Sequence, residues 1–214
     1  MASIVSSYEL TPEIVRSRLI DTKASTHIDD AYNYKDFKNF PDNDGSLFSD
    51  TFSLASVLVP IVKNSKGLKV LFTKRSKILG DHPGEVSFPG GRMNKDDKNI
   101  CSTAVRETYE EVGIKRNQME IIGFLDPIIT ISGFLVTPIV AFIDDHIKYV
   151  IDEIEVESVF EVPLSFLLNP ENKHKSNRVF NGKNFLVTEY FYEKYKIWGA
   201  TAMIILLLKN LLKN

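Results

Sequence analysis

The sequence predicts an α/β (α+β) fold in which a mixed β-sheet is sandwiched between helices. Runs of β-branched and apolar residues alternate along the chain with segments of helical period. Hydrophobic residues make up 43% of the 214 residues and charged residues 25%, which is ordinary for a folded globular chain. We therefore expect one domain over residues 1–214, with residues 1–50 as an N-terminal helix and loop extension.

The first half of the chain is expected to supply two helices and a β-hairpin. Thr11 is a predicted N-cap, because Pro12 favours the first turn of a helix. Gly67 marks a turn between two β-branched runs, and Gly113 marks the end of the second helix. In order, the expected elements are a helix through Ile20, a loop or lid at 29–50, strands at 54–62 and 68–73, a loop rich in Gly and Pro, and a helix at 99–112.

The second half is expected to add strands and a buried C-terminal helix. The dipeptide Asn181-Gly182 predicts a hairpin, because these residues tolerate the positive φ of a tight turn. Trp198 is assigned to the core. The expected elements are strands at 119–125, 135–143 and 156–162, a short helix at 164–168, the hairpin around 179–187 and a helix within 197–208.

Charge and cysteine content restrict the classes of partner. Lys and Arg total 26 against 28 Asp and Glu, so we expect no nucleic-acid partner. The single cysteine, Cys101, forms no internal disulfide and no Cys-rich zinc site. The apolar stretch 197–208 is too short for a bilayer span, so we expect no membrane partner. Without a clear targeting signal, we expect an intracellular protein, in the cytoplasm first, with mitochondria or peroxisomes left open.

Three glutamates define the candidate site. Glu107, Glu110 and Glu111 share one helical face, since they are spaced i, i+3 and i+4. Such carboxylates repel one another unless a hard cation such as Mg²⁺ or Mn²⁺ binds between them. Arg106 reaches Glu110 at i+4 and is expected to orient it. The alternative, a merely solvated acidic face, is disfavoured because the Gly-rich turn Phe88-Pro89-Gly90-Gly91 precedes the helix.

These residues resemble the Nudix box, in which a Gly, five residues, an acid and seven residues precede Arg-Glu-U-x-Glu-Glu-x-Gly-U, with U aliphatic. Asp97 stands where the family usually has Glu, eight rather than seven residues precede Arg106, and Thr108 replaces an aliphatic residue. We assign no role to Asp97. The resemblance implies a Nudix fold and metal-dependent pyrophosphate hydrolysis. The implied catalytic residues are Glu107, Glu110, Glu111 and Arg106, and the implied metal-binding residues are Glu107, Glu110, Glu111 and Gly91.

A second resemblance, to the coenzyme A pyrophosphatase subfamily, narrows the substrate. The segment 71–91 is similar to its motif LLTxRSxxxRxHxGxVxFPGG, with Phe72 replacing a Leu and Gly80 replacing an Arg. Glu155-Val156 and the stretch 197–202 also resemble that subfamily. The resemblance implies coenzyme A or an acyl-CoA thioester as substrate. The candidate substrate-binding residues are Lys74, Arg75, His82, Gly90 and Gly91.

Two other functions remain open. One is a Nudix hydrolase of another nucleoside diphosphate derivative, such as NADH, ADP-ribose or a capped nucleotide. The other is a Nudix-fold binding protein without catalysis, which is disfavoured because all three helix glutamates and Arg106 are present. The sequence does not determine the oligomeric state or the number of metal ions.

Overall fold

The computed structural model describes residues 10–32, 52–180 and 183–213. Its larger sheet has eight strands with the central order β3-β2-β1-β7-β5, while β4, β6 and β8 pair with β1, β7 and β2. The bounds are β1 Ser53–Asn64, β2 Gly67–Arg75, β3 Val86–Ser87, β4 Gly90–Arg92, β5 Glu120–Phe124, β6 Ile128–Ile129, β7 Phe134–Asp144 and β8 Val156–Pro163.

This sheet is mixed, as the sequence predicts. Strands β1 and β7 are parallel, and the remaining pairs of the sheet are antiparallel. A second sheet has the order β11-β10-β9. Its strands are β9 His174–Phe180, β10 Lys183–Tyr192 and β11 Tyr195–Trp198.

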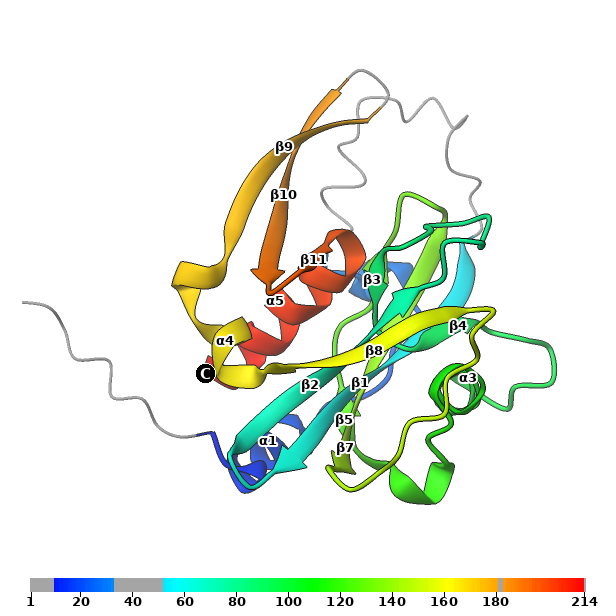
Figure 1. Ribbon diagram of the computed structural model, residues 1–214. Coiled ribbons are helices and arrows are strands. Elements are labelled where there is room, and N and C mark those ends of the chain that lie inside the picture. Colours follow the sequence, from blue (N-terminus) through cyan, green and yellow to red (C-terminus); the bar gives the residue numbers. More distant parts are fainter. Residues whose placement is uncertain (1–9, 33–51, 181–182, 214) are drawn as a thin grey trace, which may run out of the picture.

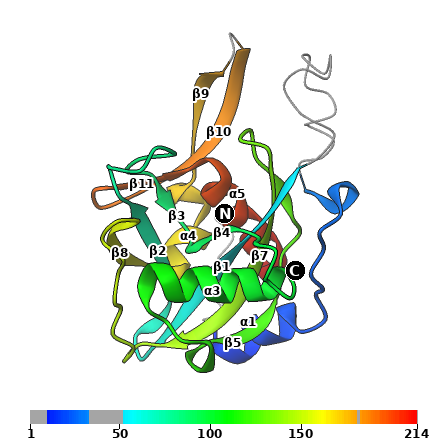
Figure 2. The ribbon, with the colours of Figure 1, turned by 90° about the vertical axis from the view of Figure 1, so that its right-hand side faces the viewer.

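Helices cover both faces of the larger sheet (Figures 1 and 2). Along β1, Leu58 and Val62 pack in the cluster under α3, whereas Val59 and Ile61 pack in the cluster on the α1 and α5 side. Successive side chains of a strand point to opposite faces of the sheet, and both sets are apolar here because both faces are buried. The helices are α1 Pro12–Leu19, α3 Ile100–Val112, α4 Leu164–Leu168 and α5 Gly199–Lys213, with three-residue 3₁₀ turns at Ile28–Asp30, Arg116–Gln118 and Pro170–Asn172.

Most predicted elements are confirmed with small shifts of their ends. Thr11 caps α1, and its hydroxyl accepts a hydrogen bond from the Ile14 N–H. The first hairpin is tighter than predicted, because Asn64 pairs directly with Gly67. The hairpin predicted around 179–187 is confirmed with longer strands, although residues 181–182 lie outside the described residues. Most of the predicted loop or lid at 29–50 also lies outside them.

Three predictions need correction. The Gly-rich and Pro-rich segment contains β3 and β4, because β1 and β2 offer it free edges. The helix expected from residue 197 begins at Gly199, since Ile197 and Trp198 extend strand β11. Trp198 is half-buried on the outer face of that strand, where the Arg178 guanidinium lies 5.3 Å from its ring centre. Within the described chain, no helix has the length and hydropathy of a membrane span.

Candidate active site

Helix α3 is fixed at both ends, which holds its acidic face in place. Asn99 caps its start in a reciprocal pair with Ser102, and Gly113 ends it with a φ of 74°. Two backbone hydrogen bonds tie its last turn to the loop before β8: the Val150 N–H donates to Val112 and the Asp152 N–H donates to Glu111, both at 3.0 Å. The opposite face of the helix packs on the sheet, with Thr108 and Val112 fully buried.

Arg106 is the cation with which Glu107 and Glu110 of the acidic face pair. Its Nε and Nη2 donate hydrogen bonds to the two carboxylate oxygens of Asp97, at 3.0 and 2.9 Å. Its Nη1 lies 2.8 Å from carboxylate oxygens of both Glu107 and Glu110, and Nη2 also donates to the Arg92 carbonyl. A guanidinium has five N–H donors, and these contacts engage them all. Arg106 therefore positions the glutamates, and it has no donor left for a substrate.

Glu107 lies directly against the Gly91 backbone. A Cβ added at Gly91 would lie 2.6 Å from the Glu107 carboxyl carbon and 2.7 and 2.8 Å from its two oxygens. Gly90, beside it, has a φ of 155°, and a Cβ there would overlap the Ser56 carbonyl oxygen. Strand β4 therefore brings bare backbone against the acidic helix, as the Gly-Gly pair predicts.

Glu111 is the buried carboxylate of the group, with only 4% of its surface exposed. Burial raises its pKa to about 8, against a hydrogen bond from the Gly90 backbone. The nearby charges of Glu107 and Glu155 also raise this pKa, while Arg75 lowers it. Burial likewise raises the pKa of Glu107, and Arg106 opposes that shift. The glutamates thus share a helical face but differ in environment, since Glu110 is half-exposed.

The candidate substrate residues divide into two groups. Arg75 lies close enough to Glu111 to affect its pKa, and its Nε donates to the Asp81 carbonyl at 3.3 Å. Lys74 instead forms an ion pair with Glu157 at 2.7 Å, and His82 pairs with Glu85 at 3.1 Å. Of these three basic residues, the structure brings Arg75 to the acidic helix and holds the other two with carboxylates of their own.

Sequence reasoning left two residues out of the site. The sequence motif assigns no role to Asp97, yet its carboxylate anchors Arg106, whose hydrogen bond lowers the Asp97 pKa to about 2. Thus Asp in place of Glu, at a lengthened spacing, still reaches the arginine. Glu155 was noted only as part of a subfamily pattern, but its charge reaches both Glu107 and Glu111. The signal for Glu155 was its place just before strand β8, whose Val156 pairs with Arg75.

The donor set suits a hard divalent cation, because it consists of carboxylates beside glycine backbone. Burial of Glu111, with its raised pKa, marks a carboxylate whose charge the protein does not fully compensate. Among the described residues, however, no group of three His, Cys, Asp or Glu side chains is already arranged around one metal position. The reason is visible in the contacts, since Arg106 holds Glu107 and Glu110 while Gly90 holds Glu111.

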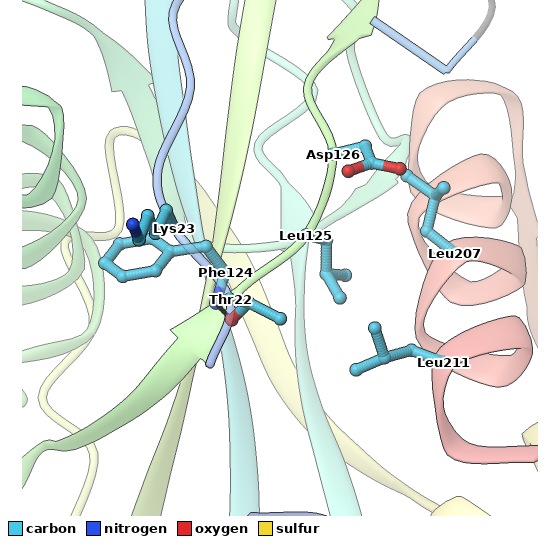
Figure 3. Close-up of a pocket in the computed structure, with 7 residues that line it drawn as sticks. All are labelled: Thr22, Lys23, Phe124, Leu125, Asp126, Leu207 and Leu211. Carbon is cyan, nitrogen blue, oxygen red and sulfur yellow. Dashed lines mark hydrogen bonds between the residues drawn. The ribbon is translucent and has the colours of Figure 1, made fainter. Parts of the chain in front are cut away.

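A small cavity lies away from these residues. It occupies about 160 Å³ between the end of β5, the segment after α1 and helix α5 (Figure 3). Leu125, Leu207 and Leu211 line its apolar side, and Lys23 and Asp126 lie at its edge. None of the candidate catalytic or substrate-binding residues contributes to it.

The fold and the site together define a Nudix-type protein, in which a Gly-Gly strand end faces an acidic helix. The model of the NUDIX domain matches residues 53–181. The chain is 41% identical over 152 residues to an uncharacterized Nudix hydrolase, NudL, of Citrobacter koseri, covering 71% of this chain and 78% of that protein. It is 40% identical over 157 residues to NudL of Photorhabdus laumondii, covering 73% and 83%. The chain belongs to the Nudix hydrolase family.

A solved structure also resembles it. The MutT/nudix family protein from Enterococcus faecalis matches 75% of this chain and 62% of its own, with a TM-score of 0.48 and 15% sequence identity.

Proposed function

We propose that the protein hydrolyses the pyrophosphate bond of coenzyme A or its thioesters, giving 3',5'-ADP and the corresponding 4'-phosphopantetheine. The observation that carries this proposal is the meeting of two segments. Arg75, within the segment that resembles the coenzyme A motif, lies close enough to Glu111 of the Nudix box for its charge to lower the Glu111 pKa. The same segment ends in Gly90 and Gly91, which contact Glu111 and Glu107.

The charges of the site suit a pyrophosphate. Its oxygens repel an incoming nucleophile, and Arg75 is the basic side chain beside the acidic helix that can offset this charge. Arg106 holds Glu107 and Glu110 together on the helix face to which we assign the cation. We assign Mg²⁺ or Mn²⁺ to Glu107, Glu110, Glu111 and the backbone of Gly91. A bound divalent ion supplies positive charge to the phosphate oxygens and makes a water ligand more acidic.

Glu155 is the best-placed proton acceptor. It is exposed, and within the described part of the chain its carboxylate makes no hydrogen bond or ion pair. The other carboxylates are committed, since Glu107 and Glu110 contact Arg106 and Glu111 contacts Gly90. A carboxylate that is free in this way can take the proton of the attacking water. The backbone of Glu155 is fixed, because its carbonyl accepts a 2.8 Å hydrogen bond from Ser76.

The test is a matched substrate panel. Purified full-length protein is incubated with Mg²⁺ and, in separate reactions, coenzyme A, an acyl-CoA, dephospho-CoA, ADP-ribose and NADH, and the products are separated by chromatography. We expect the highest kcat/KM for coenzyme A or its thioester, with release of 3',5'-ADP. A site that pairs with the 3'-phosphate should discriminate against dephospho-CoA.

The Glu111→Gln variant, purified in the same way, controls for contaminating phosphatases. If ADP-ribose or NADH is consumed faster than coenzyme A, the substrate assignment fails and the Nudix assignment survives. If the parent protein and this variant hydrolyse the panel equally, the assignment of the catalytic site fails.

A further inference from the structure

Strands β9 and β10 form a two-stranded arm that leaves the body of the protein. We define the arm as residues 176–180 and 183–187. Both ribbon views show it rising past the larger sheet and the helices, and β9 lies on its outer side in Figure 1. The base of the hairpin is anchored, since Tyr190 is fully buried in the core. An isolated two-stranded ribbon is only marginally stable in water, so the arm lacks the support that its base has.

Apolar residues continue along the arm on the face that is buried at its base. Leu186 lies four residues before Tyr190 on the same strand, so both side chains point to one side. Val179 pairs with Asn184 and Leu186 pairs with Asn177, which places Val179 and Leu186 diagonally on that same side. Val179 is 70% exposed and Leu186 is 62% exposed. The side of the hairpin that packs into the core at Tyr190 is therefore exposed at Val179 and Leu186.

Within the described part of the chain, the outer edge of β9 has no partner strand. Among the strands that the structure describes, β9 pairs with β10 alone. Every second residue of His174–Phe180 therefore points its N–H and C=O to this edge, where no described strand pairs with them. Such an edge is a template for another strand.

The charged side chains of β9 restrict which strand can pair with this edge and in which register. Native edge strands often carry charged side chains that oppose pairing, and β9 carries Lys175 and Arg178. When two copies of β9 run antiparallel with full overlap, the central residue Asn177 lies opposite itself. Lys175 then faces Val179 of the other copy, and Arg178 faces Ser176. Like charges are never opposite in this register. Arg178 is also neutralised within its own sheet, because it lies 3.0 Å from the buried carboxylate of Glu189.

We propose that the protein forms a two-fold dimer through this edge, with the β9 strands of two copies paired antiparallel about Asn177. The two three-stranded sheets then become one continuous sheet across the dimer. The aliphatic stem of Lys175 covers Val179 of the other copy, which removes apolar surface from water. The pairing is isologous, so it closes after two chains and does not propagate into a fibre.

The test uses charges placed at the two-fold axis of the full-length chain. Light scattering after size exclusion should give the parent twice the chain mass of 24.3 kDa, falling toward the monomer mass on dilution. Asn177 is exposed, so substitution should leave the fold intact. Asn177→Lys and Asn177→Asp each place like charges opposite one another, which should weaken the dimer by about fivefold. A mixture of the two variants pairs opposite charges and should restore the parent's dimer affinity.

Asn184→Lys is the matched control, because Asn184 lies on the same side of the arm but on β10, away from the open edge. It should remain as dimeric as the parent. A parent that stays at 24.3 kDa at every concentration overturns the proposal. So does a dimer that tolerates Asn177→Lys and Asn177→Asp separately, a mixture that fails to recover, or a control that dissociates equally.

Discussion

Replacing Gly91 with Ala should separate the chemistry of the site from the stability of the fold. The new Cβ would lie 2.6 Å from the carboxyl carbon of Glu107. Restoring the 3.4 Å of ordinary contact requires a displacement of about 0.8 Å, and the group that moves is the end of a flexible side chain. Misplacing a reacting group by about 1 Å lowers rates by roughly a hundredfold. We expect a loss of kcat of that order, with the free energy of unfolding lowered by about 1 kcal/mol or less.

Two other glycines, Gly80 and Gly90, supply the controls for this variant. At Gly80 a Cβ meets nothing within 4 Å, so Gly80→Ala should leave both activity and stability near those of the parent. At Gly90 the Cβ would overlap backbone and the φ is 155°, so Gly90→Ala should lower the melting temperature strongly. The assay is 3',5'-ADP release from coenzyme A with Mg²⁺, together with thermal denaturation. Gly91→Ala activity within threefold of the parent, or a melting temperature as low as that of Gly90→Ala, would refute the reasoning.

Four further predictions follow from single contacts. Arg75→Ala should lower kcat/KM by about tenfold or more with an unchanged melting temperature, because its charge faces the substrate site; unchanged kinetics with lost stability would make Arg75 structural. Glu155→Gln should lower kcat far more than it raises KM, since the amide accepts no proton; a kcat equal to the parent's would exclude Glu155 as the base. The pKa of Glu111 is raised to about 8 from 4.5, so its contribution to stability is present below pH 4.5 and is lost as the pH rises through 8. In a chelating buffer, Glu111→Gln should therefore flatten the decline in unfolding free energy across that window, and a parallel decline would contradict the assignment. With Mg²⁺ present, the same variant should lose most turnover. Lys209 is 5% exposed and, in the described chain, its Nζ has no hydrogen-bond partner. Lys209→Met should therefore raise the unfolding free energy, measured by thermal denaturation, by about 1–3 kcal/mol. A loss of stability would show that Lys209 has a partner.

The elements that the sequence predicted well are those with a local signal. Helix α3 has a cap residue at Asn99, a stop at Gly113 and an apolar stripe between them, and all of these act within the helix itself. The strands β1 and β7 are long apolar runs that a sheet buried on both faces requires. These features depend on residues close together in the sequence, so they can be predicted without knowledge of the tertiary structure.

The parts that sequence reasoning missed depend on contacts between distant segments. Glu155 enters the site because the loop before β8 is tied to helix α3 by the Asp152 N–H and to Ser76 by its own carbonyl. Trp198 looked like a core residue by type, but β11 turns its outer face away from the core. The short strands β3 and β4 form because β1 and β2 offer edges to pair with, and no local pattern encodes that pairing.

The burial of Glu111 favours a functional site over a solvated acidic face, the two interpretations that the acidic helix allowed. A solvated face leaves its carboxylates in water at their ordinary pKa, because burying an uncompensated charge is unfavourable. Here Arg106 forms ion pairs with Glu107 and Glu110, while Glu111 remains buried with a pKa raised to about 8. The ionised form of such a carboxylate is unfavourable in the fold, and under our proposal a bound cation takes up its charge. Arg106 occupies the other two glutamates on the same face, and Glu111 is therefore the residue whose substitution distinguishes a functional site from an acidic surface.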